Sequence, residues 1–207
     1  GGINRIRCMP QMKNIVATWS DQGKVHMWDL ENQMKQLDGP AQASENLKPL
    51  FTFDGHQDEG FAMAWDPHTD GQFASGDCAG GMALWQPSDG GWDVNWCVDK
   101  GECNGAHADS VEDIDWKKHG NGIGHCFAST GVDRSVKLWD TRLTAPAAVT
   151  LKIENAADCD INVLSWNPVV GDLLLTGQDD GCFKVWDIRN TKRPMANFHW
   201  HRKPITS

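Results

Sequence analysis

The sequence predicts an all-β protein made of four copies of one antiparallel unit, and three observations support this. Residues 107–142 contain the runs VEDIDW, HCFAST and SVKLWD, whose alternation of apolar and polar residues is typical of half-buried strands. A tryptophan near the end of the third run recurs at Trp28, Trp85, Trp139 and Trp186. Ten residues before each of them stands a hydroxyl side chain, at Thr18, Ser75, Ser129 and Thr176.

These recurring positions predict the strands of each copy in order. First strands are INRIRCMP, EGFAMAW, SVEDIDW and INVLSW, and second strands are NIVATWS, QFASGD, HCFAST and DLLLTG. Outer fourth strands are KPLFTFD, WDVNWCVD, AAVTLKI and PMANFHW. Between third and fourth strands we expect a long loop at residues 31–47 that turns helical near its end, and a tight Gly-rich turn at residues 86–92.

The repeat length is that of a β-propeller, in which about 40–45 residues form one blade, stretched here by insertions. We therefore predict one incomplete propeller domain, with blades at residues 1–54, 55–98, 99–153 and 154–200 and the start of a fifth blade at 201–207. The sequence begins and ends within expected first strands and lacks a starting methionine. We expect it to hold about four blades of a seven-bladed ring.

Within the third copy, four side chains have the spacing of the polar network that closes a propeller blade: His107, Ser129, Asp133 and Trp139. The chain resembles a WD-repeat protein, and the resemblance implies that these four form a hydrogen-bonded relay. A relay is physically reasonable, because polar groups that a neighbouring blade buries must find partners within their own blade. The corresponding relay residues of the other copies are His56, Ser75 and Trp85 in the second, and Thr176, Asp180 and Trp186 in the fourth.

The hairpin aspartate of the relay is replaced in two copies. Six residues before the third-strand tryptophan stand Gln22 in the first copy and Ala79 in the second. We therefore expect only the third blade to hold the whole relay, and the second blade to depend more on packing.

The amino-acid composition narrows the range of possible functions. The chain has 28 acidic and 19 basic residues and a formal charge of -9, which argues against direct binding of nucleic acid through its phosphates. No apolar run approaches the ~18 residues of a membrane span. Seven cysteines, an odd number and scattered, favour a reducing compartment.

Catalytic and metal sites are weakly supported. His107, Ser129 and Asp133 hold the residue types of a catalytic triad, but the serine lies in an expected strand and no oxyanion-hole motif accompanies it. Cys97, Cys103 and His107, with His125 and Cys126 nearby, do not match a structural zinc spacing. We predict no enzymatic activity, no metal and no cofactor.

An acidic binding face is the favoured functional site. Loops before first strands and between second and third strands share one face of a propeller, and many carboxylates fall on them. We expect a Lys/Arg-rich client there, although local turn hydrogen bonds explain Asp58 and Asp109 equally well. The residues predicted to bind the client are Asp58, Glu59, Glu112, Asp113, Asp158 and Asp160, with Asp21, Asp54, Asp77, Asp109 and Asp179 on the same face.

More specific strings are FTFDGHQDEGFAMAWDP, the GDC at 76–78, LWQPSDGGW, SVEDIDW and INVLSWNP. Through them the chain resembles the glutamate-rich WD-repeat protein family, which is related to the retinoblastoma-binding histone chaperones. The resemblance implies a chaperone of the nucleus and nucleolus, with a cytoplasmic pool, that acts in ribosome biogenesis. It would escort a basic protein of the large ribosomal subunit, and histone binding is implied as well.

The strings WDTR and WDIR support an alternative. In substrate receptors of cullin-based ubiquitin ligases, an arginine two residues after the Trp-Asp pair engages the ligase adaptor, and Arg142 and Arg189 match that pattern. Pairing of each arginine with a nearby surface carboxylate is the competing interpretation.

Overall fold

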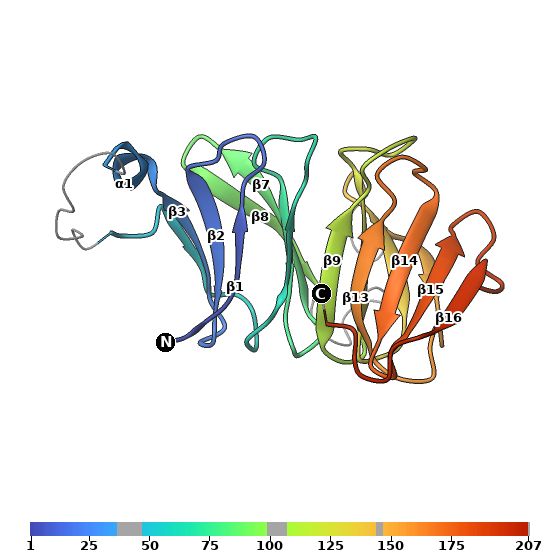
Figure 1. Cartoon of the computed structure of the whole chain (residues 1–207). Coiled ribbons are helices and arrows are strands. Elements are labelled where there is room, and N and C mark those ends of the chain that lie inside the picture. The colour runs from blue at the N-terminus through green and yellow to red at the C-terminus, as the bar shows by residue number, and fades with distance from the viewer. Residues whose placement is uncertain (37–46, 99–106, 144–146, 207) are drawn as a thin grey trace.

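The chain folds into four antiparallel sheets of four strands each (Figure 1). The computed structural model describes residues 1–36, 47–98, 107–143 and 147–206. Within every sheet the strands follow one another in chain order, so each sheet is one meander. The strands are β1 (Ile3–Cys8), β2 (Ile15–Ser20), β3 (Val25–Asp29), β4 (Phe51–Phe53), β5 (Ala62–Trp65), β6 (Phe73–Gly76), β7 (Met82–Ser88), β8 (Gly91–Val98), β9 (Val111–Trp116), β10 (Cys126–Gly131), β11 (Val136–Asp140), β12 (Val149–Ile153), β13 (Ile161–Trp166), β14 (Leu173–Gln178), β15 (Cys182–Asp187) and β16 (Ala196–His199).

These positions confirm the four predicted copies of the strand pattern. The described start of the 31–47 insertion forms the short helix α1 (Glu31–Lys35), and the helix expected near its end falls mostly on residues outside the described ones. Residues 86–92 are mostly strand, because β7 and β8 remain paired as far as Ser88 and Gly91. The turn is confined to Asp89 and Gly90.

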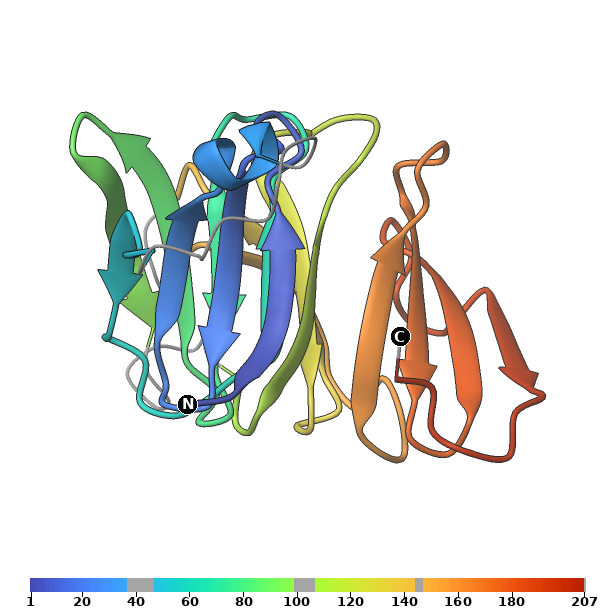
Figure 2. The same cartoon turned by 60° about the vertical axis from the view of Figure 1, so that its left-hand side comes forward.

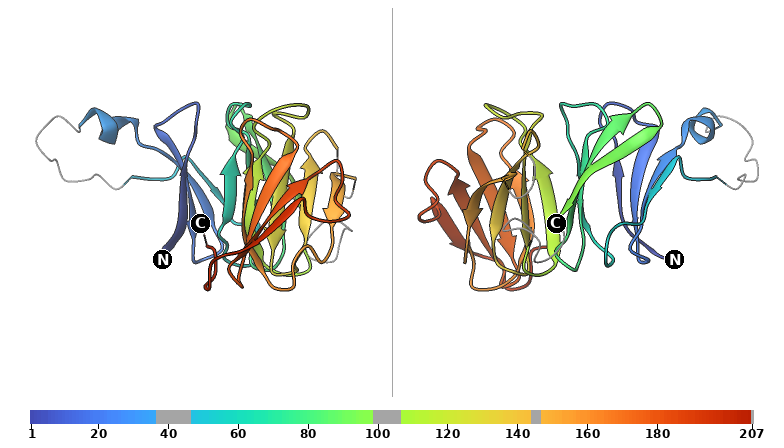
Figure 3. Two further views of the ribbon diagram at one scale, coloured as in Figure 1. Left: turned by 45° about the vertical axis from the view of Figure 1, so that its right-hand side comes forward. Right: turned by 180° about the vertical axis from the view of Figure 1, so that it is seen from behind.

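The sheets stand side by side as blades, with the first and fourth at the two ends of the row (Figures 2 and 3). Their inner strands β1, β5, β9 and β13 are neighbours. Apolar cores fill the spaces between blades: Trp19 and Met27 of the first sheet, for example, pack in one cluster with Phe73 and Trp85 of the second. A sheet with a blade on each side buries whole strands, as β6 of the second sheet shows.

The first-strand tryptophans join each blade to the one before it. Each indole N–H donates to a carbonyl oxygen on the inner strand of the preceding blade. The three bonds, each 3.0 Å long, run from Trp65 to Arg7, from Trp116 to Ala64 and from Trp166 to Asp115. This repeated contact explains a second tryptophan in three of the four copies. In the first copy, Cys8 ends the strand instead.

Charged side chains form a second set of contacts between the inner strands of different blades. Arg5 of β1 reaches across the second blade to Asp113 of β9, with 3.4 Å between the guanidinium nitrogen and the carboxylate oxygen. Asp113 and Asp115 also accept the backbone N–H groups of Leu164 and Trp166 on β13, at 3.0 and 2.9 Å. Burial raises the pKa of Asp113 to about 6, against the lowering effect of these donors.

In the part of the chain that the structure describes, no helix combines the length and apolar character needed to cross a membrane.

The indole contacts can be tested with Trp116→Phe, which keeps a large apolar ring but removes the N–H. The Ala64 carbonyl loses its donor at a buried blade junction, so the free energy of unfolding should fall by about 1–3 kcal/mol. Urea denaturation followed by circular dichroism measures this. Trp200→Phe is the matched control, because Trp200 is 83% exposed and should change stability by less than about 0.5 kcal/mol. An equal loss of stability in the two variants would contradict the role of the Trp116 indole N–H in joining the blades.

Candidate functional site

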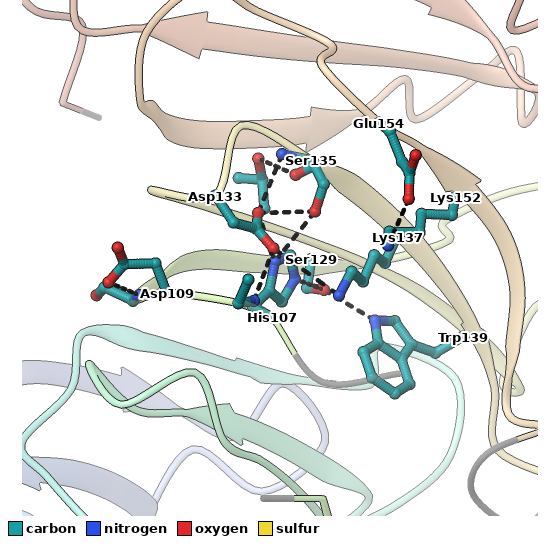
Figure 4. A network of polar contacts seen from close by, with 12 residues as sticks. His107, Asp109, Ser129, Asp133, Ser135, Lys137, Trp139, Lys152 and Glu154 are labelled. Atoms are coloured by element: carbon teal, nitrogen blue, oxygen red, sulfur yellow. Dashed lines mark hydrogen bonds and ion pairs between the residues drawn. The ribbon is translucent and has the colours of Figure 1, made fainter. Parts of the chain in front are cut away.

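The third blade is closed by a continuous chain of hydrogen bonds (Figure 4). The Trp139 indole donates to the Ser129 hydroxyl at 2.8 Å, and that hydroxyl lies 2.7 Å from His107 Nε2. His107 Nδ1 lies 3.0 Å from an Asp133 carboxylate oxygen. Because an ionised carboxylate only accepts, His107 donates from Nδ1 to Asp133, and Nε2 of the neutral ring then accepts the proton of Ser129. We call such a chain a polar lock.

The environment fixes the charges of this lock. Burial lowers the pKa of His107, although the neighbouring Asp133 carboxylate acts in the opposite direction. Burial alone would raise the pKa of Asp133, but hydrogen bonds from His107, Ser135 and the Ala108 N–H bring it well below its usual range. The lock therefore combines a neutral imidazole with an ionised carboxylate at neutral pH.

The second blade contains a complete lock as well, so the prediction that only the third blade does is wrong. His56 Nδ1 lies 3.0 Å from Asp77, and His56 Nε2 lies 2.7 Å from the Ser75 hydroxyl. The Trp85 indole donates to Ser75 at 3.0 Å. Asp77 directly follows β6, two residues before Ala79. The hairpin itself is no longer than that of the third blade, since Ser75 pairs with Ala83 as Ser129 pairs with Lys137, so the lock carboxylate comes from an earlier position of the same turn. Counting back from the tryptophan therefore missed it.

The outer two blades hold partial locks. In the fourth blade the Trp186 indole donates to Thr176 at 3.1 Å, and Asp180 accepts the backbone N–H of Cys182 at 2.8 Å. In the first blade the Trp28 indole donates to the Thr18 hydroxyl at 2.8 Å.

The residues that resemble a catalytic triad are structural in this geometry. Ser129 is fully buried and its oxygen already accepts the Trp139 indole. Cys103 lies outside the described residues, as does the side chain of Cys97. Among the residues with described side chains, no three His, Cys, Asp or Glu residues form a group that could hold a metal ion.

Carboxylates gather at one edge of the blades, the lower edge in Figure 1, where the loops before first strands and between second and third strands meet. We call this edge the lower face. Among the described residues of these loops and the adjoining strand ends, basic residues are few: Lys24, Arg134, Arg202 and Lys203. The exposed or half-buried acidic residues described there, apart from the lock residue Asp133, are Asp21, Asp54, Asp58, Glu59, Asp109, Glu112, Glu154, Asp158, Asp160, Asp179 and Asp180.

Three of these carboxylates surround one thiol. Burial raises the pKa of Cys78, and the charges of Glu112, Asp58 and Glu59 raise it further, which places all three close to that cysteine. Asp58 also accepts the N–H of Glu59 at 2.8 Å, and Asp109 accepts that of Ser110 at 2.9 Å. The turn contacts anticipated for both aspartates therefore exist, while their side chains remain at the surface.

Two predicted members of this face do not lie on it. Asp77 is 1% exposed and belongs to the second polar lock. The Asp113 side chain is 13% exposed, pairs with Arg5 and accepts the Leu164 N–H. Both point into the protein because their neighbours offer donors that the loop pattern of the sequence did not reveal.

The two arginines of the Trp-Asp-x-Arg strings lie at the opposite, upper edge, after β11 and β15. Each folds back on the aspartate of its own string: Nε of Arg142 donates to Asp140 at 2.9 Å, and Nε of Arg189 donates to Asp187 at 2.9 Å. The Arg189 guanidinium, with a backbone donor, lowers the pKa of Asp187 to about 2. Both arginine side chains remain more than half exposed, at 62% and 67%.

Four-stranded blades closed by such locks define a WD-repeat protein, and the family described as WD domain, G-beta repeat matches residues 101–140 and 152–187. Glutamate-rich WD repeat-containing protein 1 of Dictyostelium discoideum is 41% identical over 152 residues, which is 73% of this chain and 30% of that protein. The protein HEAT STRESS TOLERANT DWD 1 of Arabidopsis thaliana is 39% identical, and ribosome assembly protein rrb1 of Schizosaccharomyces pombe is 34% identical. Each of these two matches covers 100% of this chain and 44% of the relative.

The chain belongs to the glutamate-rich WD-repeat protein family. It spans less than half the length of these relatives.

The second polar lock can be tested with Asp77→Ala. The substitution leaves His56 and the backbone N–H groups of Gln57 and Gly81 without their acceptor. We expect the free energy of unfolding to fall by about 3–5 kcal/mol, because several buried donors lose their shared acceptor and each unsatisfied group costs about 1–3 kcal/mol. Chemical denaturation should give a similar loss for Asp133→Ala. Asp58→Ala, on an exposed carboxylate nearby, is the control, and a loss no larger than in this control would refute the lock.

Proposed function

We propose that this chain is part of a non-enzymatic scaffold and chaperone for assembly of the large ribosomal subunit, which escorts a basic ribosomal protein on its lower face. The observation that carries this proposal is the excess of carboxylates over basic side chains on that face. The relative named ribosome assembly protein rrb1 supports the cellular process. Nuclear and nucleolar localisation, with a cytoplasmic pool, follows from the same process. Histones are a second class of basic client with the same chemistry.

The polar locks support this function because they position the acidic loops. Asp77 accepts the backbone N–H of Gln57 at 3.1 Å, and Asp133 accepts that of Ala108 at 3.0 Å. These two residues directly precede Asp58 and Asp109. The acidic loops therefore start from anchored backbone, which reduces the entropy that a client must remove on binding. The exposed carboxylates attract a basic client over a distance of about 8–10 Å at moderate salt.

We also propose that the four blades belong to a seven-bladed ring. The fourth sheet presents Leu175, Phe183 and Phe198 on the face that corresponds to the covered face of the first sheet. These side chains are only partly buried, and a hollow of about 480 Å³ lies over that face. Ile205 donates its N–H to the Gln178 carbonyl at 3.1 Å, as Val111 of the third blade does to the carbonyl of Asp77 at 3.0 Å. These features suit a following blade.

Client binding can be tested by reversing Asp58, Glu59 and Glu112 to Lys in the full-length protein. The three side chains near Cys78 then carry positive instead of negative charge and repel a basic client. Capture of basic large-subunit ribosomal proteins at low salt should therefore fall at least about tenfold. Quantitative mass spectrometry of co-purified proteins measures this.

The matched control reverses Asp70, Asp89 and Asp93, which are exposed acidic residues outside the lower face, and gives the same net charge. Capture should be retained in this control. Unchanged capture by the lower-face variant, with an intact fold, would exclude the proposed client site.

A second candidate function is that of a substrate receptor of a cullin-based ubiquitin ligase. The observation in its favour is that Arg142 and Arg189 are exposed at equivalent positions of successive blades. The Arabidopsis relative, whose name contains DWD, supports it. Both guanidinium groups already bind their own aspartates, so an adaptor would use the outward-facing donors that remain.

The double variant Arg142→Ala and Arg189→Ala tests this function. It leaves Asp140 and Asp187 without their guanidinium partners at the upper edge but does not touch the lower face. Adaptor co-purification should drop at least about tenfold if the arginines engage it, while client capture stays unchanged. Undiminished adaptor binding removes this function.

A further inference from the structure

The fourth blade lacks the histidine of the polar lock and places thiols around the lock aspartate instead. His107 stands nine residues before Trp116 in the third blade, and the residue nine before Trp166 is Ala157. Asp180 nevertheless keeps the hairpin position of Asp133. In this blade the carboxylate must find other donors.

Cysteine side chains from two separate segments supply those donors. Cys182 begins β15 and gives its backbone N–H to Asp180 at 2.8 Å. Both thiols lower the pKa of Asp180 against the effect of burial, which places them close to its carboxylate. The Asp179 N–H donates to the Asp160 carbonyl at 3.0 Å and holds the loop of Cys159 against the hairpin that carries Asp180. Cys159 lies in the loop before β13, so Asp180 brings together two cysteines that are far apart in the sequence.

A histidine completes this cluster from the outer strand. His199 of β16 is the direct cross-strand neighbour of Cys182, and its Nδ1 lies 2.7 Å from the Cys182 sulfur. Cys182 is 6% exposed, whereas Cys159 is half-buried and His199 is exposed. A solvent-borne reagent therefore reaches Cys159 first, and an imidazole nitrogen is in place beside the second thiol.

We propose that Cys159 and Cys182 form a reversible modification site that is oxidised to an intramolecular disulfide by small-molecule disulfides of the glutathione type. This inference does not depend on the proposed client. It assigns chemistry to the one blade in which thiols replace the imidazole of the lock.

The reaction balances by thiol–disulfide exchange in two steps. The Cys159 thiolate attacks one sulfur of the oxidised reagent, which forms a mixed disulfide and releases the first reduced thiol. His199 Nδ1 accepts the proton of Cys182, the resulting thiolate attacks the Cys159 sulfur, and the expelled thiolate takes up the proton and leaves as the second reduced thiol. Two protein thiols are oxidised, and one reagent disulfide is reduced to two thiols.

The disulfide would join the loop before β13 to the start of β15, next to Asp158 and Asp160 of the lower face. It would also remove both thiol protons from the surroundings of Asp180. Burial raises the pKa of Cys159 and of Cys182, so both are protonated at neutral pH. Oxidation should therefore accelerate as the pH rises, by about tenfold between pH 7 and pH 8.

The experiment treats the folded chain with oxidised glutathione, traps remaining thiols by alkylation and analyses the tryptic peptide 153–184, which holds both cysteines without an internal Lys or Arg before Lys184. The expected product is this peptide two hydrogen masses lighter, with neither cysteine alkylated and full recovery after reduction. Cys8→Ser, at an exposed cysteine of β1, is the control and should leave the reaction unchanged.

Two variants separate the steps. In Cys182→Ser, which introduces the residue type found at Ser135 in the third blade, the mixed disulfide at Cys159 should accumulate. In His199→Gln, formation of the mixed disulfide should be unchanged and its conversion to the internal disulfide should slow at least tenfold. A stable mixed disulfide at Cys159 in the unsubstituted chain, or alkylation of both cysteines after treatment, would overturn the proposal. Equal conversion in His199→Gln would overturn the role of the histidine.

Discussion

Each complete polar lock depends on one buried carboxylate, Asp77 or Asp133, that stays ionised. An ionised group inside a blade is unfavourable unless several donors converge on it. Here the donors are a histidine ring and backbone N–H groups from the loop that carries the histidine. The same hydrogen bonds that satisfy the carboxylate therefore fix the start of an acidic surface loop. In these blades, a change in the hydrogen bonds of the lock carboxylate therefore also changes the position of the acidic loop.

The junctions between blades rest on a different contact, which also repeats. Cores alone do not define the stagger of one sheet against the next, because apolar packing is only weakly directional. The indole of each first-strand tryptophan donates to the inner strand of the previous blade and supplies that direction. At the third junction, Asp113 and Asp115 add donors from the β13 backbone. Polar contacts thus determine how adjacent blades are aligned, and the apolar cores fill the space between them.

The sequence predicted the strands, the third lock and the acidic loops, because each depends on local periodicity and fixed spacing. It could not predict Asp77 as a lock member, since in a hairpin of the same length the carboxylate comes from two residues before the counted position. Asp113 appeared to belong to a surface loop, but its burial depends on Arg5 and on a backbone N–H from β13, which are distant in the chain. The role of the first-strand tryptophans also required the neighbouring blade. Contacts within one blade follow from spacing, whereas contacts between blades do not.

The arrangement of charge separates the two candidate functions in space. Acidic loops occupy the lower face, and Arg142 and Arg189 lie at the upper edge beyond the opposite ends of the same strands. The strands have three to eight residues, most of them five or six, and place these edges roughly 15–25 Å apart, which exceeds the screening length at moderate salt. Carboxylates on the lower face therefore contribute little to the electrostatic energy at the arginines. A basic client and a second protein at the upper edge could bind the same chain together without competing for charge.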